Sequence, residues 1–292
     1  SNPYCCHEAQ RTMFETARTA QDTANDGWVP DDIMQNLCRM NDLDTTIAVE
    51  LARDGDARMR EAISRRNDLS EDVIRVAMQT FSDAERQRVL EKLYARDGAP
   101  SVELQRDIFL QSRTMTECWL VALHTEDREL QLDIARASLM ATAEDRTAGS
   151  LAGLLENSTV YPEVAELLTR SAEASIRCRV LSSGLNPELS KAVSMERRLE
   201  MARNDESPSV RIAACAVAEP GHALEQLVFH DQTFREGFEA GGLRDLEQAL
   251  LQNSHLSVEL QQHIAAHGTP SQQRDLAKSI RDIDDDVVRT LA

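Results

Sequence analysis

Three potential metal ligands follow one another at four-residue intervals near the end of the chain. They are Glu259, His263 and His267, and His255 stands just before them. A spacing of four places side chains on one face of a helix, and these residue types bind zinc. Residues eight positions apart, however, lie about 12 Å apart along a helix axis, too far for Glu259 and His267 to reach one ion. We therefore expect a solvated polar face here rather than a native metal site.

Other catalytic patterns are incomplete. Cys118 precedes His124, and Cys215 precedes His222, as a nucleophile and a base would, but both cysteines lie in apolar stretches. Burial raises the pKa of a thiol and removes its reactivity. The acidic run 282–286 resembles the opening of a calcium loop without its glycine, and no glycine-rich phosphate loop occurs. The sequence predicts a protein that is not an enzyme and has no cofactor.

Arginines are the strongest candidates for binding chemistry, since all but three of the 32 basic residues are arginines. One arginine follows an apolar residue in each of four similar helix starts, which would form a ladder along one face for a protein or peptide partner: Arg60, Arg177, Arg211 and Arg289. The alternative is that each guanidinium pairs with a neighbouring carboxylate. A local basic patch is a further expectation, through Arg58, Arg60, Arg65 and Arg66.

The overall charge limits the class of partner. The chain has 50 acidic residues and a net charge of −18. Such a protein repels the phosphate backbone of DNA, which binds clustered Lys and Arg. A nucleic-acid partner is therefore disfavoured. A nucleic-acid-related helical-repeat protein, or an acidic mimic of DNA that binds a basic partner, remains as an alternative.

The elements that position these residues are predicted to be α-helices throughout. Apolar residues make up 41% of the chain but aromatic residues only 4%, which suits closely stacked helices. Apolar residues recur at spacings of three or four, and capping residues mark helix starts. Residues 82–85 and 269–272 fit the reciprocal capping box, and Pro187 follows Asn186 as the first residue of a helix.

Similar helix starts recur along the chain at irregular intervals, at residues 67–73, 158–164, 184–189 and 254–260. One helix pair cannot bury its apolar stripe alone, whereas stacked pairs share a continuous core. We expect an all-α fold, a curved superhelical solenoid of stacked helix pairs over residues 28–292. An N-terminal helical cap is expected at 1–27, and a candidate internal break near 241–242.

The run of residues 51–77 resembles a unit of the leucine-rich repeat variant family, and residues 168–193 and 201–227 are similar to it. The resemblance implies a superhelix of alternating short helices, close in shape to HEAT-like arrays. Some members of that family carry an iron-sulfur cluster on N-terminal cysteines, a comparison that Cys5, Cys6 and Cys38 invite. Four thiolates are the usual requirement, and no C-x-x-C pair occurs here.

No apolar run of 18 residues and no signal-peptide profile occur, which predicts a cytoplasmic protein without a membrane partner. The leading functional hypothesis is a non-catalytic scaffold that binds a protein or peptide partner through its concave surface. A metal or iron-sulfur protein that uses the N-terminal cysteines is the alternative from another class.

Overall fold

The computed structural model describes residues 6–23, 28–96, 98–141, 145, 147–182, 186–216, 221–238, 240–251 and 256–279. All regular secondary structure in these ranges is helical, which confirms the all-α prediction. No helix in the same ranges has both the length and the apolar composition that crossing a bilayer would require.

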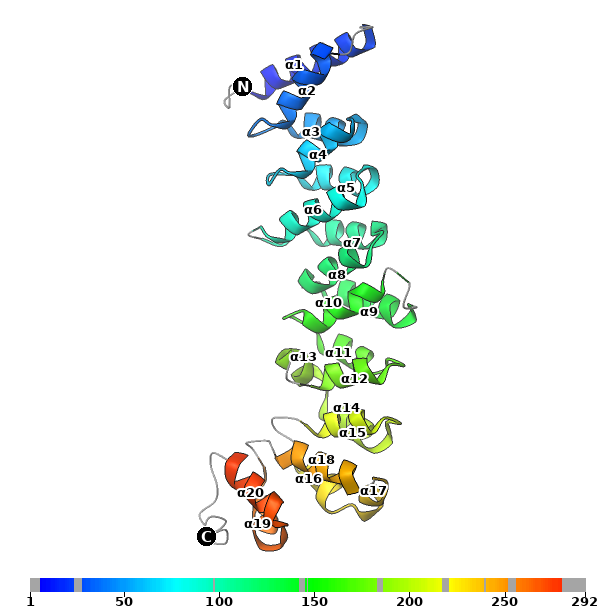
Figure 1. Cartoon of the computed structure of the whole chain (residues 1–292), viewed down its shortest axis with the longest axis vertical. Coiled ribbons are helices and arrows are strands. Elements are labelled where there is room, and N and C mark those ends of the chain that lie inside the picture. Colours follow the sequence, from blue (N-terminus) through cyan, green and yellow to red (C-terminus); the bar gives the residue numbers. More distant parts are fainter. Residues whose placement is uncertain are drawn as a thin grey trace. The chain divides into compact units, whose positions relative to one another are not determined.

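The chain divides into two compact units. Unit 1 comprises Ser1–Leu130 with Met140–Gly153, and unit 2 comprises Gln131–Leu139 with Leu154–Ala292. The helices of unit 1, shown in blue to green in Figure 1, are α1 (His7–Thr23), α2 (Trp28–Cys38), α3 (Thr45–Asp54), α4 (Ala57–Ser64), α5 (Glu71–Thr80), α6 (Asp83–Tyr94), α7 (Val102–Gln111) and α8 (Met115–His124).

Two helices contribute to both units, and the rest belong to unit 2. The shared helices are α9 (Arg128–Met140) and α10 (Ala148–Glu156). Those of unit 2 are α11 (Pro162–Leu168), α12 (Ala174–Leu181), α13 (Pro187–Ala192), α14 (Met195–Asn204), α15 (Pro208–Cys215), α16 (Gly221–Phe229), α17 (Gln232–Glu236), α18 (Ala240–Leu251), α19 (Val258–His267) and α20 (Pro270–Ser279). The Gly241-Gly242 pair lies in the first turn of α18.

Helices that are not consecutive in the chain form series of contacts within each unit. In unit 1, α3 contacts α5 and α5 contacts α7, while α2, α4, α6 and α8 form a second series of successive contacts. In unit 2, α12, α15, α18 and α20 form such a series. Many apolar side chains of these helices are fully buried, such as Ile63, Leu90 and Leu246. Each helix therefore hides its apolar stripe against its neighbours, as amphipathic helices require.

Two of the predicted helix starts carry the expected capping bonds. The Thr269 amide donates to Gln272 Oε1 over 2.7 Å, and the Gln272 amide donates to Thr269 Oγ1 over 3.3 Å, which confirms this capping box. Asn186 caps α13 by accepting from the Leu189 amide over 3.1 Å, with Pro187 as the first helical residue. These bonds satisfy amides that have no partner inside the helix.

A second kind of cap comes from a side chain on an earlier helix of the same unit. Four side chains, which we term the bridging residues, accept the backbone N–H of the residue that caps a later helix: Gln10 for Asp44, Glu71 for Ser101, Gln131 for Tyr161 and Glu225 for Ser257. The donor and acceptor residues are 30 to 34 positions apart. Tyr161 makes no capping bond with its own side chain, and its backbone N–H donates to Gln131 Oε1 over 3.4 Å.

Two of these caps belong to identical pentapeptides, Ser-Val-Glu-Leu-Gln, at residues 101–105 and 257–261. In each copy the serine caps its helix and is held by a bridging glutamate. In each copy the glutamine is buried and donates over 2.9 Å to the carbonyl of the residue before the serine. The two segments thus repeat in structure as well as in sequence.

Buried arginines form a third set of links between helices. Arg86 and Glu117 are both fully buried and form a two-point ion pair between α6 and α8. Arg86 also donates to the Met78 and Gln111 carbonyls, each over 2.7 Å. Arg198 lies 3% exposed in unit 2 and donates to Ser190. Most of the hydrogen-bonding capacity of these guanidinium groups is used inside the fold.

Candidate functional site

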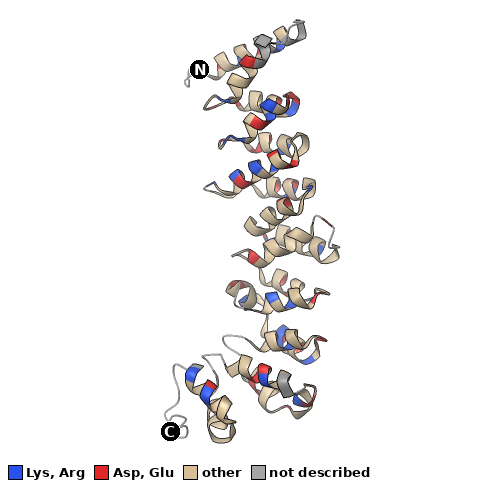
Figure 2. Cartoon of the chain, viewed as in Figure 1, with Lys and Arg blue, Asp and Glu red and all other residues tan. Residues whose placement is uncertain are grey.

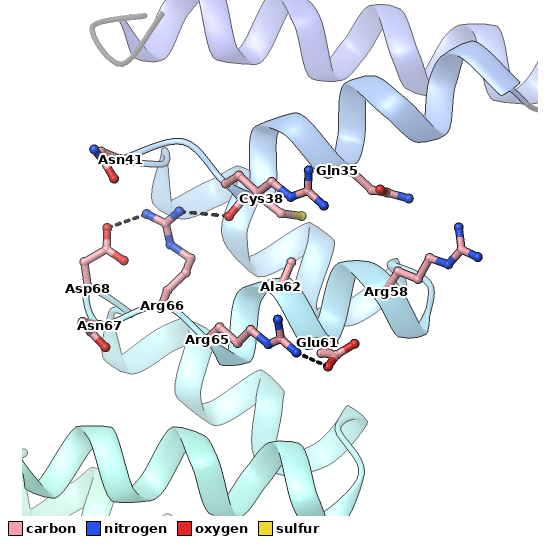
Figure 3. Close-up of a pocket in the computed structure, with 11 residues that line it drawn as sticks. Gln35, Cys38, Asn41, Arg58, Glu61, Ala62, Arg65, Arg66, Asn67 and Asp68 are labelled. Atoms are coloured by element: carbon pink, nitrogen blue, oxygen red, sulfur yellow. Dashed lines mark hydrogen bonds and ion pairs between the residues drawn. The ribbon is translucent and has the colours of Figure 1, made fainter. Parts of the chain in front are cut away.

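A pocket of about 730 Å³ lies in unit 1 between α2 and α4, and Asn67 and Asp68 of the loop that follows α4 also line it (Figure 3). Four arginines line it, together with two acidic residues and five uncharged ones: Gln35, Cys38, Arg39, Asn41, Arg58, Glu61, Ala62, Arg65, Arg66, Asn67 and Asp68. Its lining therefore carries two more positive than negative charges, in a chain whose net charge is −18.

Two of the arginines have guanidinium groups available to a ligand. Arg39 follows the last residue of α2 and Arg58 lies in the first turn of α4, and both are exposed. Within the described ranges, neither side chain has a hydrogen-bond or ion-pair partner. Figure 3 shows Arg58 extending from α4 on the same side of the pocket as Gln35.

The other two arginines form the wall of the pocket. Arg65 donates to Glu61 over 2.6 Å, one turn earlier on the same helix. Arg66 donates to the Cys38 carbonyl and pairs with Asp68 (Figure 3). It also donates to the Met40 carbonyl. The Arg66 side chain is only 10% exposed, so it joins the end of α2 to the loop after α4. The two carboxylates of the lining are therefore already paired with these wall arginines.

Further basic groups stand behind this wall. Lys92 of α6 donates to the Arg65 carbonyl. Burial lowers the pKa of Lys92, and the charges of Arg88, Arg65 and Arg96 lower it further. Burial also raises the pKa of the Cys38 thiol to about 12, so this group adds no negative charge at neutral pH. The basic groups in and next to the lining therefore outnumber the acidic groups of the lining.

The predicted arginine ladder has a different environment. Arg60 is half-buried and donates to the Gly55 carbonyl over 2.8 Å. Arg177 is 6% exposed and pairs with Asp205 at 2.8 Å, as the ion-pair alternative expects. Arg211 lies over the Phe238 ring, 3.7 Å from its centroid, and donates to the Ala202 carbonyl. Arg289 lies outside the described residues. The three described guanidinium groups all make contacts within the chain.

The described residues that the sequence suggested as metal ligands lie near the N-terminus and in α19. His263 and His267 have ring centroids 5.4 Å apart, whereas His255 lies outside the described ranges. Within those ranges no group of three or more His, Cys, Asp or Glu could hold a metal ion. Cys6 is exposed and Cys38 is buried, while Cys5 and the acidic run 282–286 are not described.

The two cysteine-histidine pairs give no nucleophile in the part of the chain that is described. Cys118 is fully buried, and His124 stacks on Tyr94 at a centroid distance of 4.9 Å. Burial lowers the pKa of His124. Burial also raises the pKa of the Cys215 thiol to about 12, and the side chain of His222 is not described. A thiol with so high a pKa is not a nucleophile at neutral pH.

The basic and acidic residues of the helices are interleaved in Figure 2, so the arginine-lined pocket does not stand out in a map of charge alone. Part of it was visible in the sequence, because Arg58, Arg65 and Arg66 belong to the predicted basic patch. Arg39 and Gln35 were missed. They come from the preceding helix and its end, and only the packing of α2 against α4 brings them to the same pocket.

The resemblance of residues 51–77 to the leucine-rich repeat variant family remains a prediction from those residues. A scan against protein-family models, a search of curated proteins and a search of solved structures each found no match to this chain.

Proposed function

We propose that the chain is a non-catalytic helical-repeat scaffold that binds a protein or peptide segment, and that the arginine-lined pocket between α2 and α4 is a point of contact. The observation that carries the proposal is the pair Arg39 and Arg58. Both side chains are exposed in one pocket and have no partner within the described ranges, whereas the guanidinium groups of Arg66, Arg86 and Arg177 are held inside the fold.

The way the helices are joined supports a scaffold. Arg66 joins the end of α2 to the loop after α4, so the walls of the pocket are linked before a ligand arrives. Preorganised walls reduce the entropy that binding loses. The contact series within each unit is typical of HEAT-like and leucine-rich repeat variant arrays, and we propose a curved solenoid of this kind.

Site-specific photo-crosslinking in cells of the source organism tests the binding role. A photoreactive amino acid placed at Asn41 or Asn67, both exposed in the pocket lining, is expected to yield a discrete cross-linked protein. The same amino acid at Arg53, an exposed position of α3 outside the lining, is the matched control. Equal labelling from all three positions, or none from the two pocket positions, would reject the proposal.

A further inference from the structure

We infer that the occupant of this pocket is an acidic segment of a partner protein, whose Asp or Glu carboxylates bind Arg39 and Arg58 while its backbone meets the neutral amides of the lining. The inference rests on the proposed function and names the chemistry of the partner. The free donors are the first argument. A guanidinium offers two parallel N–H groups that match the two oxygens of a carboxylate, which gives shorter and stronger bonds than neutral pairs.

The charges that face these donors are the second argument. Glu61 is bound by Arg65 and Asp68 by Arg66, so neither carboxylate of the lining is left to neutralise Arg39 or Arg58. Lys92 and the arginines around it lie behind the Arg65 wall. A ligand with negative charge therefore meets a lining whose own charges sum to a positive value.

The neutral part of the lining is the third argument, and it favours a peptide over a nucleic acid. Gln35, Asn41 and Asn67 carry side-chain amides, which both donate to and accept from a peptide backbone. None of the eleven lining residues is aromatic, so bases have no surface on which to stack. The net charge of −18 also repels a long polyanion, whereas a short acidic segment interacts mainly with its local surroundings.

Fluorescence anisotropy with the full chain and a labelled peptide of alternating Glu and Ser tests the inference. The expected result is saturable binding that weakens as salt rises. The double variant Arg39→Gln/Arg58→Gln should bind about tenfold more weakly or worse, because two charge-assisted contacts are lost. The control variant Arg53→Gln/Arg203→Gln has the same net charge, alters two exposed arginines outside the pocket, and should bind as the unaltered chain does.

Three outcomes would overturn the inference. The first is equal weakening by the pocket and control variants, which would make the effect one of overall charge. The second is equal binding of a peptide with Gln in place of Glu. The third is tighter binding of a single-stranded oligonucleotide that depends on Arg39 and Arg58. Circular dichroism of the double variant should match that of the unaltered chain, because neither side chain has a partner within the described residues.

The two proposals fail in different ways. A cross-link from Asn41 or Asn67 together with no preference for the acidic peptide would leave the scaffold standing and reject its acidic partner. An absence of cross-links from the pocket positions would reject the scaffold site itself.

Discussion

Arg86 and Glu117 form a two-point ion pair in which both side chains are fully buried, with Nε 2.7 Å from Oε1 and Nη2 3.0 Å from Oε2. The pair joins α6 to α8, and Glu117 Oε2 also accepts from the Thr114 amide at the start of α8. When a buried charged group loses its partner, no water molecule is present to take the partner's place.

Glu117→Leu should therefore destabilise unit 1 by about 3–5 kcal/mol, because it leaves the Arg86 guanidinium buried and unpaired. The double variant Arg86→Met/Glu117→Leu should recover much of that loss. Urea unfolding followed by circular dichroism measures both, and hydrogen exchange locates the change in α6–α8. A double variant no more stable than Glu117→Leu would contradict this account of the pair.

The bridging bond of Glu71 predicts a dependence of stability on pH. The Ser101 hydroxyl and amide hold the pKa of Glu71 below its ordinary value. A carboxylate with a lowered pKa in the folded state contributes stability above its unfolded pKa, about 4.3, and loses it as pH falls through the folded pKa. Glu71→Gln should cost about 1 kcal/mol at neutral pH, a discounted figure because Glu71 is 39% exposed.

The same variant should show a smaller loss of stability than the unaltered chain on going from neutral to acidic pH. Thermal unfolding across that range measures the difference. Glu15→Gln is the control, since Glu15 is exposed and its side chain has no partner within the described residues. If the stability of the two variants falls by the same amount from neutral to acidic pH, the bond between Glu71 and Ser101 does not stabilise the fold.

Gly149 and Gly153 of α10 lie against the backbone of α8. A Cβ at Gly153 would come within 2.5 Å of the Trp119 carbonyl oxygen, and one at Gly149 within 2.3 Å of that of Met115. Gly153→Ala should therefore destabilise the protein by about 1–3 kcal/mol, although alanine favours helices. Gly242→Ala in α18 meets only an ordinary contact at 3.4 Å and should be neutral or slightly stabilising. Thermal unfolding should give a lower melting temperature for Gly153→Ala, and an unchanged or slightly higher one for Gly242→Ala.

Thiol reactivity tests the placement of the cysteines. At neutral pH, iodoacetamide should modify the exposed Cys6 rapidly, whereas Cys38 and Cys215 should react only after unfolding. Burial raises the pKa of both thiols to about 12, so almost none of either is present as thiolate. Peptide mass spectrometry before and after addition of urea reads out each site. Early modification of Cys38 would show that α2 opens readily from α4.

Helix identity and many helix starts could be predicted from the sequence because they depend on neighbouring residues. Asn186 before Pro187 and the capping box from Thr269 to Gln272 need no tertiary contact to be recognised. The ion pair of Arg177 with Asp205 could not be predicted from neighbouring residues, because the two residues are 28 positions apart. The basic patch at 58–66 was visible as a local run, whereas Arg39 joins it only through the contact of α2 with α4.

The identical pentapeptides at 101–105 and 257–261 were a readable signal of structural repetition. Their meaning needed the structure, because the glutamates that hold them, Glu71 and Glu225, occur in dissimilar local sequences. A long-range bond between two common residue types leaves no pattern in a single sequence.

Each bridging residue precedes in the chain the capping residue whose backbone N–H it accepts, in all four cases. Each bond therefore joins an acceptor on an earlier segment to a donor on a later one. As a ribosome releases the protein from its N-terminus, Gln10 is available before Asp44 is made, and Glu225 before Ser257. At these four helix starts the acceptor is synthesised before the amide that donates to it, so each of these caps can form in the order of synthesis without waiting for the end of the chain.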